Sequence, residues 1–208
     1  MMRLCFSFLC VLVLSSYAVA YDPLDQKDPN GNITIKWDVI SWTEDGYVAT
    51  VKINNFQKFR QIKNPGWTLG WTWAKKEIIW NMIGAQTTEQ GDCSKFKRYT
   101  PLPRCCKKIP TVVDLLPSVP YYRQFPNCCK GGVVAAFGQS EFEATIGQAG
   151  NTSKTVRLPQ NFTLLAPGAR YTCRPAKIVP STIYISPDKR HTTRAFMTWD
   201  AICKYTKG

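Results

Sequence analysis

The chain has 208 residues, of which 44% are hydrophobic and 20% are charged, and its 27 Lys and Arg against 14 Asp and Glu give a net charge of +13. This length and apolar content suffice for one domain with a proper core, and no stretch is long and apolar enough to span a bilayer. The composition therefore indicates one folded, strongly basic domain and no transmembrane segment.

The first twenty residues predict a secretory signal peptide. Arg3 precedes a nearly unbroken apolar run from Leu4 to Leu14, and Ala18-Val19-Ala20 forms a cleavage site of small residues. The run is well short of the roughly 20 residues that a membrane anchor needs. Its removal takes one of the 27 basic residues and none of the 14 acidic ones, so the net charge falls from +13 to +12. We expect residues 21–208 to form the secreted domain.

Alternating polar and apolar residues predict two strands, 33–39 and 47–53, joined as a hairpin by a turn at Glu44-Asp45-Gly46. Further strands are expected at 67–74, 78–83, 133–137, 155–158, 161–165, 182–185 and 194–203. Fourteen prolines and 13 glycines separate these runs, and no long helical periodicity is present. The pattern predicts an all-β fold, an antiparallel β-sandwich or a jelly roll.

The segment from Thr87 to Lys130 differs from the rest of the chain. It is rich in Cys, Pro, Lys and Arg, and only Val112 to Leu116 has a regular pattern. We interpret it as a long, irregular excursion from the sandwich, fixed by disulfides.

Seven cysteines remain after the signal peptide is removed: Cys93, Cys105, Cys106, Cys128, Cys129, Cys173 and Cys203. Neighbouring cysteines bridge each other only with strain, so each doublet is expected to bond two different partners. Three bridges among seven cysteines allow roughly 105 pairings and leave one thiol over. Zinc is a weaker interpretation, because there is no Cys-x-x-Cys and His191 is the one histidine. We expect no metal.

Three sequons lie on the predicted secreted chain, at Asn32, Asn151 and Asn161. None has proline in its middle position. Each glycan would mark a position that faces solvent.

The most prominent local feature is a row of tryptophans. If residues 66–74 are extended, Trp67, Trp71 and Trp73 share one face with Leu69, at about 6.6 Å between successive positions. Exposed, such rings could stack on the apolar faces of glucan sugars. The opposite interpretation is that they fill the core, as large apolar side chains usually do.

Other aromatic residues are candidates for the same role. Trp42 lies beside the predicted turn and is expected to be more exposed than Trp37 or Trp199, which lie in regular strands. Tyr121 and Tyr122 lie in the cysteine-rich segment, where they could complete a sugar platform or cover the edge of the core.

Short basic clusters are spread over the chain: Lys75-Lys76, 95–98, Arg104 with Lys107-Lys108, and Lys189-Arg190. This charge with interleaved aromatic residues would suggest nucleic acid on a cytosolic protein, but secretion argues against it, and we expect no nucleic-acid partner. A basic protein outside the cell suits an anionic polysaccharide or a membrane surface, and an ordinary solvated face is the alternative.

No catalytic motif is recognisable. His191 has no serine or cysteine context typical of a triad, and the carboxylates are scattered, although a spatial pair remains open. Residues 28–32 have a misplaced glycine for a calcium loop and are interpreted as a turn. We expect neither a cofactor nor catalysis.

Seven stretches of the chain resemble plant COBRA and COBRA-like proteins. They are ITIKWDVISWTEDGYVATVKINNFQ, NPGWTLGWTWAKKEIIW, MIGAQTTEQGDCSKFK, CCKKIPTVVDLLPSVPY, FPNCCKGGVVAAFGQ, LPQNFTLL and RPAKIVPSTIY. The resemblance implies an extracellular glycoprotein, usually GPI-anchored, that associates with cellulose and influences microfibril deposition and oriented cell expansion. It also implies a carbohydrate-binding module whose stacking aromatics correspond to Trp67, Trp71 and Trp73, with Trp42 as a further candidate.

The sequence also departs from the family pattern. The cysteine-rich continuation containing CCVS and the anchor signal do not follow Gly208, the span from Gln139 to Gly147 is shorter than usual, and residues 200–202 replace a common sequon. We expect a short form in the cell wall or apoplast, whereas an anchored form would lie on the outer face of the plasma membrane. The odd cysteine would then lack a partner from the missing region.

The resulting expectation is a non-catalytic protein that binds cellulose or another wall glucan and contributes to microfibril organisation. Two alternatives remain: an enzyme acting on wall polysaccharide, and a secreted signalling or interaction protein.

Overall fold

The computed structural model describes residues 23–206, so the predicted signal peptide lies outside the described residues. The chain begins with a short helix, α1 (Pro23–Lys27). Its strands are β1 (Ile33–Trp42), β2 (Tyr47–Asn55), β3 (Thr68–Thr72), β4 (Ile78–Ile83), β5 (Ala85–Thr87), β6 (Thr111–Asp114), β7 (Gln139–Gly147), β8 (Gln160–Ala166), β9 (Ala169–Cys173), β10 (Lys177–Val179), β11 (Ile183–Ile185), β12 (Thr192–Arg194) and β13 (Met197–Thr206). Two 3₁₀ turns, η1 (Ser94–Phe96) and η2 (Tyr121–Arg123), lie in loops.

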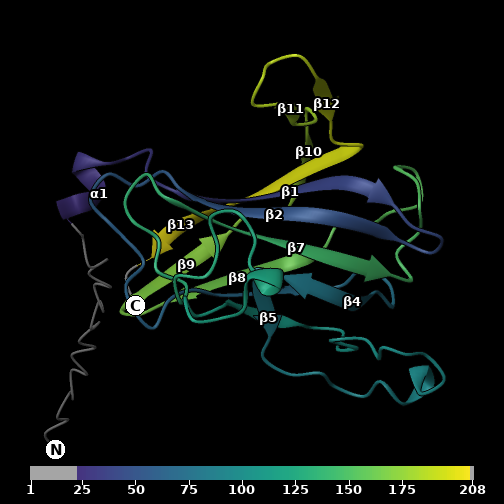
Figure 1. Ribbon diagram of the computed structural model, residues 1–208. Coiled ribbons are helices and arrows are strands. Elements are labelled where there is room, and N and C mark those ends of the chain that lie inside the picture. Colours follow the sequence, from purple (N-terminus) through teal and green to yellow (C-terminus); the bar gives the residue numbers. More distant parts are fainter. Residues whose placement is uncertain (1–22, 207–208) are drawn as a thin grey trace, which may run out of the picture.

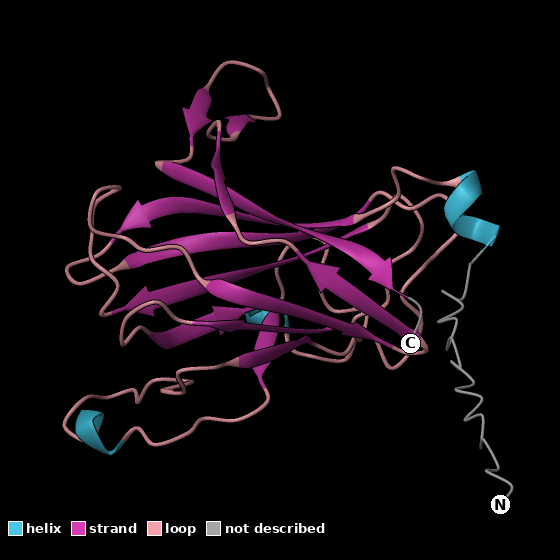
Figure 2. Ribbon diagram, turned by 180° about the vertical axis from the view of Figure 1, so that it is seen from behind, coloured by secondary structure: helices cyan, strands magenta, loops and turns pink. Residues whose placement is uncertain are grey.

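One large antiparallel sheet forms the body, with the strand order β4-β7-β2-β1-β13-β9-β8-β3-β6-β5 and with β10 paired to β13. The sheet curls so that its first five strands lie over its last five, which makes it nearly barrel-like (Figures 1 and 2). Strands β11 and β12 form a separate hairpin that stands off the body (Figure 1). The all-β prediction is confirmed.

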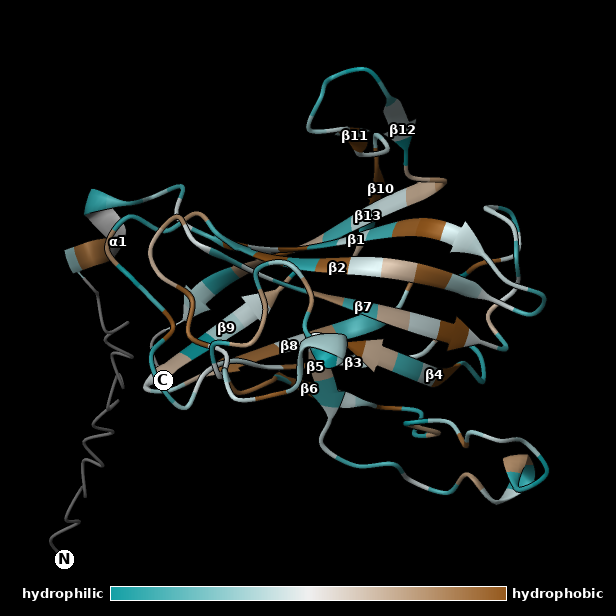
Figure 3. Ribbon diagram, viewed as in Figure 1, coloured by the Kyte–Doolittle hydropathy of each residue, from teal (hydrophilic) through white to brown (hydrophobic). Residues whose placement is uncertain are grey.

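The predicted hairpin is present and extends over β1 and β2, with Trp37 opposite Val51 in register. Apolar side chains at alternate positions point inward, and Figure 3 shows hydrophobic and hydrophilic residues in bands along β1, β2 and β7. This alternation is the reason why the strands pair with one face buried.

Two predicted strands are absent. Residues 133–137 are mostly irregular and make one isolated bridge, between Val134 and Ile62. Residues 155–158 are also irregular and begin in a turn, where the Thr155 N–H donates to the Thr152 carbonyl. The strand β7 was not predicted, although it lies between β4 and β2. Its glutamates obscure the apolar alternation of Phe142, Ala144 and Ile146.

The predicted excursion at 87–130 is divided by β6, which lies between β3 and β5 in the sheet. Residues 88–110, called the excursion loop below, project away from the body and carry η1 at their far end (Figure 1). Residues 115–138 form a second loop that carries η2.

Three disulfides are present in the described part of the chain. Cys93–Cys106 closes most of the excursion loop, and Cys173–Cys203 joins β9 to β13 at an in-register pair. Cys105 is free and buried, which confirms the prediction of one unpaired thiol.

The third disulfide, Cys128–Cys129, joins neighbours, so the prediction that each doublet bonds two different partners is wrong for this pair. The backbone there turns through left-handed conformations at Asn127 (φ 61°) and Cys129 (φ 65°). A strand or helix could not bring adjacent side chains together in this way, but such a turn can.

Within residues 23–206, no helix has the length and apolar character needed to cross a membrane.

Candidate carbohydrate-binding groove

The predicted tryptophan platform belongs to the core. Trp67, Trp71 and Trp73 are almost completely buried, and Trp71 has no exposed surface. Trp71 packs edge to face on Trp37 and on Trp73, with ring centroids 5.2 and 5.3 Å apart. The sequence correctly predicted that these rings share a face, but the face points between the two halves of the sheet. A glucan therefore cannot reach them, and the interpretation as core residues holds.

Trp42 lies at the end of β1 and is half-buried. Its ring contacts Tyr47 and Phe196, at centroid distances of 6.4 and 5.9 Å. Phe196 is exposed, so this end of the curled sheet presents a small aromatic surface that is separate from the tryptophan core.

Tyr121 and Tyr122 are the most exposed aromatic residues of the described chain, at 88% and 78%. Both lie on η2, and hydrogen bonds fix this turn. The Arg123 N–H donates to the Pro120 carbonyl at 2.9 Å, and the Gly84 N–H donates to the Arg123 carbonyl at 2.8 Å. The second bond ties the tyrosine turn to the junction of β4 and β5.

The same loop is held from below by a buried carboxylate that sequence reasoning missed. Asp114 accepts hydrogen bonds from the backbone N–H groups of Leu115, Cys129, Lys130 and Gly132, all at 2.8 to 2.9 Å. Because a buried carboxylate needs such partners, it fixes the loop at the start and at the end. In the sequence, the one sign of this role is that Asp114 directly precedes two leucines, Leu115 and Leu116.

The structure places Tyr122 at an open groove of about 810 Å³ between β4, β5 and the excursion loop. Polar side chains dominate the part of the lining that could meet a sugar: Asn81, Gln86, Thr88, Gln90, Arg104 and Arg123. Amide and guanidinium groups with one exposed ring are suited to sugar hydroxyls and to the apolar face of a sugar. Tyr121 is adjacent in sequence but does not line the groove.

Hydrogen bonds position the wall that the excursion loop contributes. The Gln90 side-chain amide donates to the Pro103 carbonyl at 2.8 Å, and the Thr87 hydroxyl donates to the Arg104 carbonyl at 3.1 Å. The Cys106 N–H donates to the Gln90 carbonyl at 2.7 Å. The two sides of the loop are therefore fastened to each other and to β5.

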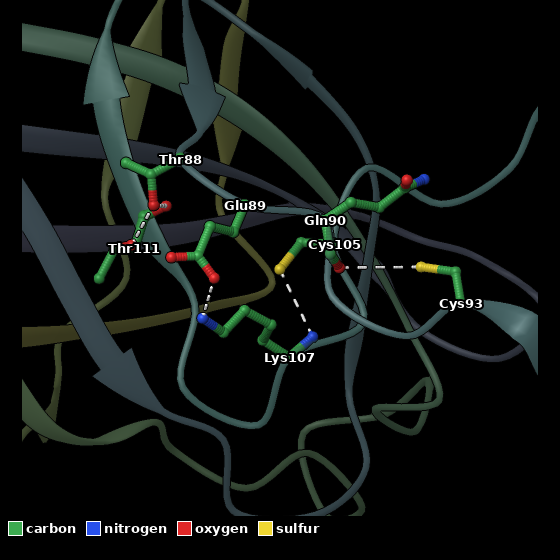
Figure 4. A network of polar contacts seen from close by, with 7 residues as sticks. All are labelled: Thr88, Glu89, Gln90, Cys93, Cys105, Lys107 and Thr111. Carbon is green, nitrogen blue, oxygen red and sulfur yellow. Dashed lines mark hydrogen bonds and ion pairs between the residues drawn. The ribbon is translucent and has the colours of Figure 1, made fainter.

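Polar contacts at the base of the loop continue this network (Figure 4). The hydroxyls of Thr88 and Thr111 are hydrogen-bonded, and Glu89 forms an ion pair with Lys107. The Lys107 N–H donates to the Cys105 sulfur at 3.5 Å. Burial raises the pKa of the Cys105 thiol, so this sulfur remains protonated at neutral pH.

The groove lacks a pair of facing carboxylates. Glu89 is the one acidic residue in its lining, and it is already paired. Most glycoside hydrolases use two carboxyl groups that flank the scissile bond. His191 lies elsewhere, exposed on the β11–β12 hairpin.

The buried carboxylates outside the groove serve the fold. Asp38 is fully buried and accepts hydrogen bonds from the hydroxyls of Thr182 and Thr198, both at 2.6 Å, and of Tyr184 at 2.9 Å. Burial and then the Asp38 charge raise the pKa of Tyr184, which keeps this phenol as a donor. This cluster attaches the segment after β10 to the sheet.

A cluster of possible metal ligands in the described part of the chain, Asp114 with Cys128 and Cys129, is chemically occupied. The sulfurs are joined in a disulfide, and the carboxylate already accepts four N–H groups. Thiolate ligation is therefore unavailable at this position.

The three sequon asparagines lie at the surface, with Asn32 half-buried and Asn151 and Asn161 exposed. The Asn151 side chain donates to the Glu44 carbonyl at 3.0 Å, and Asn32 accepts from the Thr34 hydroxyl at 2.9 Å. Glycosylation at these positions stays a prediction.

Comparison with known proteins gives consistent matches. The COBRA N-terminal domain matches residues 47–206. The chain is 64% identical to COBRA-like protein 4 of Arabidopsis thaliana, over 99% of this chain and 48% of the relative. It is 59% identical to COBRA-like protein 6 of Oryza sativa subsp. japonica and 57% identical to Protein COBRA of Arabidopsis thaliana, each over 96% of this chain and 45% of the relative.

The chain thus spans just under half the length of these relatives. No solved structure matches it. The matching domain covers most of the described sheet, from β2 to the end of β13, and the sequence identities extend over nearly the whole chain. The chain belongs to the COBRA family.

Proposed function

We propose that this chain is a non-catalytic, extracellular protein that binds a glucan chain of the plant cell wall, cellulose above all, in the groove beside Tyr122. The observation that carries the proposal is an exposed tyrosine, Tyr122, in the lining of an open and largely polar groove. The COBRA resemblance supports cellulose as the ligand, and with it a contribution to microfibril organisation and oriented cell expansion. The protein would act in the wall or apoplast, or at the outer plasma-membrane face if anchored.

The proposed contacts follow from sugar chemistry. The Tyr122 ring offers an apolar face against which a pyranose can stack, and its hydroxyl stays available for a hydrogen bond. Asn81, Gln86 and Gln90 can each donate and accept, so they suit hydroxyl groups that do both. Because hydrogen bonds hold the walls before a ligand arrives, binding loses little conformational entropy.

The absence of a carboxylate pair in the groove supports a binding role over catalysis. An enzyme acting on wall polysaccharide would release soluble sugars from cellulose or xyloglucan. A signalling or interaction protein would bind protein partners and show no glucan affinity.

Cellulose retention by the purified protein tests the proposal. We expect Tyr122→Ala to weaken retention by about tenfold, by analogy with the roughly 1 to 3 kcal/mol that a stacked aromatic side chain contributes per base in nucleic-acid binding. Phe59→Ala is the matched control, because it removes an exposed ring from a different part of the surface. Equal retention by wild type and Tyr122→Ala, or release of soluble sugar by the wild type, would overturn the proposal.

A further inference from the structure

A second aromatic cluster lies outside the core, at the tip of the excursion loop. Trp80 of β4 packs edge-on against Phe96 and Tyr99, with centroid distances of 5.5 Å to each ring, and Phe96 and Tyr99 are 6.1 Å apart. Trp80 and Phe96 are half-buried, while Tyr99 is 57% exposed. None of the three belongs to the main core.

The tip is attached to the body at defined points. The Phe96 N–H donates to the Cys93 carbonyl and the Tyr99 N–H to the Phe96 carbonyl, both at 2.9 Å, next to the Cys93–Cys106 disulfide. On the body, Trp80 lies on Gly147 of β7, where an added Cβ would come within 2.2 Å of the indole nitrogen. A glycine is therefore needed for this ring to approach the β7 backbone so closely.

Three cationic residues lie within four positions of Tyr99 in the chain. Lys95, Lys97 and Arg98 are exposed, and among residues 23–206 none of them makes an ion pair. Asp92 is the acidic residue at this tip. Its carboxylate accepts a hydrogen bond from the Ser94 N–H at 2.9 Å, and bonds from Ser94, followed by the nearby lysines, lower its pKa. The tip thus keeps an excess of positive charge beside the exposed Tyr99 side chain.

We propose that this tip binds an acidic polysaccharide, a polyuronate, as a site separate from the glucan groove. Tyr99 would stack on a sugar ring, and Lys95, Lys97 and Arg98 would meet carboxylates repeated along the polymer. The inference rests on the proposed extracellular location. A membrane surface fits less well, because the three rings contact one another and leave little apolar surface for insertion among lipids.

The excursion loop contributes one wall of the groove and also carries the tip. One molecule could therefore hold a neutral glucan beside Tyr122 and an acidic polymer at the tip of the loop. Leu102 and Arg104 line the groove, whereas residues 95–99 do not. The two binding events are therefore separable by substitution.

The test is binding of polygalacturonate, measured at low and at physiological salt. The triple variant Lys95→Gln/Lys97→Gln/Arg98→Gln should lose affinity by about tenfold or more at low salt, because clustered cations raise the local concentration of an anionic ligand. Tyr99→Ala should lose several-fold at both salt concentrations, because stacking is not screened.

The control is a second triple variant, Lys189→Gln/Arg190→Gln/Arg194→Gln, which removes the same charge from the β11–β12 hairpin. It should retain most of the affinity. An equal loss in both triple variants would mean that net charge alone is responsible and would overturn the site.

Two further outcomes would also overturn it: unchanged binding in both tip variants, and binding of the wild type to phosphatidylserine vesicles without binding to polygalacturonate. Cellulose retention measured on the same tip variants should match the wild type. Tyr122→Ala should lose cellulose retention while it keeps polygalacturonate binding. Such a result shows that the groove and the tip can fail independently. An unchanged thermal midpoint in each variant shows that the fold is intact.

Discussion

Trp37 and Trp71 meet edge to face across the interior, with ring centroids 5.2 Å apart and ring planes at 86°. Trp37 also stacks on Trp199 at 5.7 Å, so the contact joins β1 and β13 to β3 from the other half of the sheet. Edge-to-face and offset stacking are the favoured geometries of aromatic pairs. This contact fixes the two halves of the curled sheet against each other.

Trp71→Ala should therefore destabilise the protein by about 3 to 5 kcal/mol, the usual cost of removing a large buried ring and leaving a cavity. Chemical denaturation followed by far-UV circular dichroism measures this loss. Tyr121→Ala, which removes a ring with 88% exposure, should change stability by less than about 0.5 kcal/mol. Similar stabilities for the two variants would contradict the assignment of Trp71 to the core.

The cysteines give a second prediction. Without reduction, the native protein should react slowly with a thiol reagent, because Cys105 is buried and its pKa is raised. Denaturation should then expose one thiol, that of Cys105, in the part of the chain from residue 23 to 206. Mass spectrometry of unreduced peptides should find Cys128 and Cys129 linked within one peptide. A peptide that links either cysteine to Cys105 would contradict the structure.

Gly147 gives a third prediction, which concerns the tip. Gly147→Ala places a methyl group against the Trp80 indole, and this ring must move. Displacement of Trp80 removes the support of Phe96 and Tyr99, so polygalacturonate affinity should fall several-fold while cellulose retention is kept. Ala149→Gly is the control, because it changes one methyl group at a buried position two residues after β7 ends. Full polygalacturonate affinity in Gly147→Ala would mean that Trp80 does not support the site.

Glu143 gives a prediction about pH. Partial burial raises the pKa of this carboxyl in the folded protein. Its contribution to stability is present below the unfolded pKa and is lost as pH rises through the folded pKa. Glu143→Gln should therefore gain stability relative to the wild type between pH 4 and pH 7. Urea denaturation of both proteins at pH 4 and at pH 7 measures their difference in unfolding free energy. A difference that is the same at both pH values would contradict this prediction.

The sequence predicted the β1–β2 hairpin correctly, because Ile33 to Val39 alternate without interruption and a turn follows. It did not predict β7, because Glu141 occupies a buried position there. Lys52, opposite it in register, forms an ion pair with Glu141 at 2.7 Å. A pairing between distant strands is needed to bury such a charge, and one strand's pattern cannot show that pairing.

The candidate site could be predicted only in part. Periodicity put Trp67, Trp71 and Trp73 on one face, but the curl of the whole sheet decides whether that face is inside. The sequence left open whether Tyr122 forms a platform or covers the edge of the core; the side chain is exposed, and its groove depends on β4, β5, η2 and the excursion loop. The Cys128–Cys129 bond depends on a local turn that Asp114 holds through long-range hydrogen bonds.

The most direct measurement is hydrogen exchange of the purified protein with and without cellohexaose. Ligand binding slows exchange where it restricts local opening. The proposed function predicts slower exchange at residues 81–90, 101–104 and 121–124, and none of this slowing in Tyr122→Ala. Slower exchange confined to the surface around Trp42 and Phe196, or no change anywhere in the wild type, would contradict glucan binding in the groove.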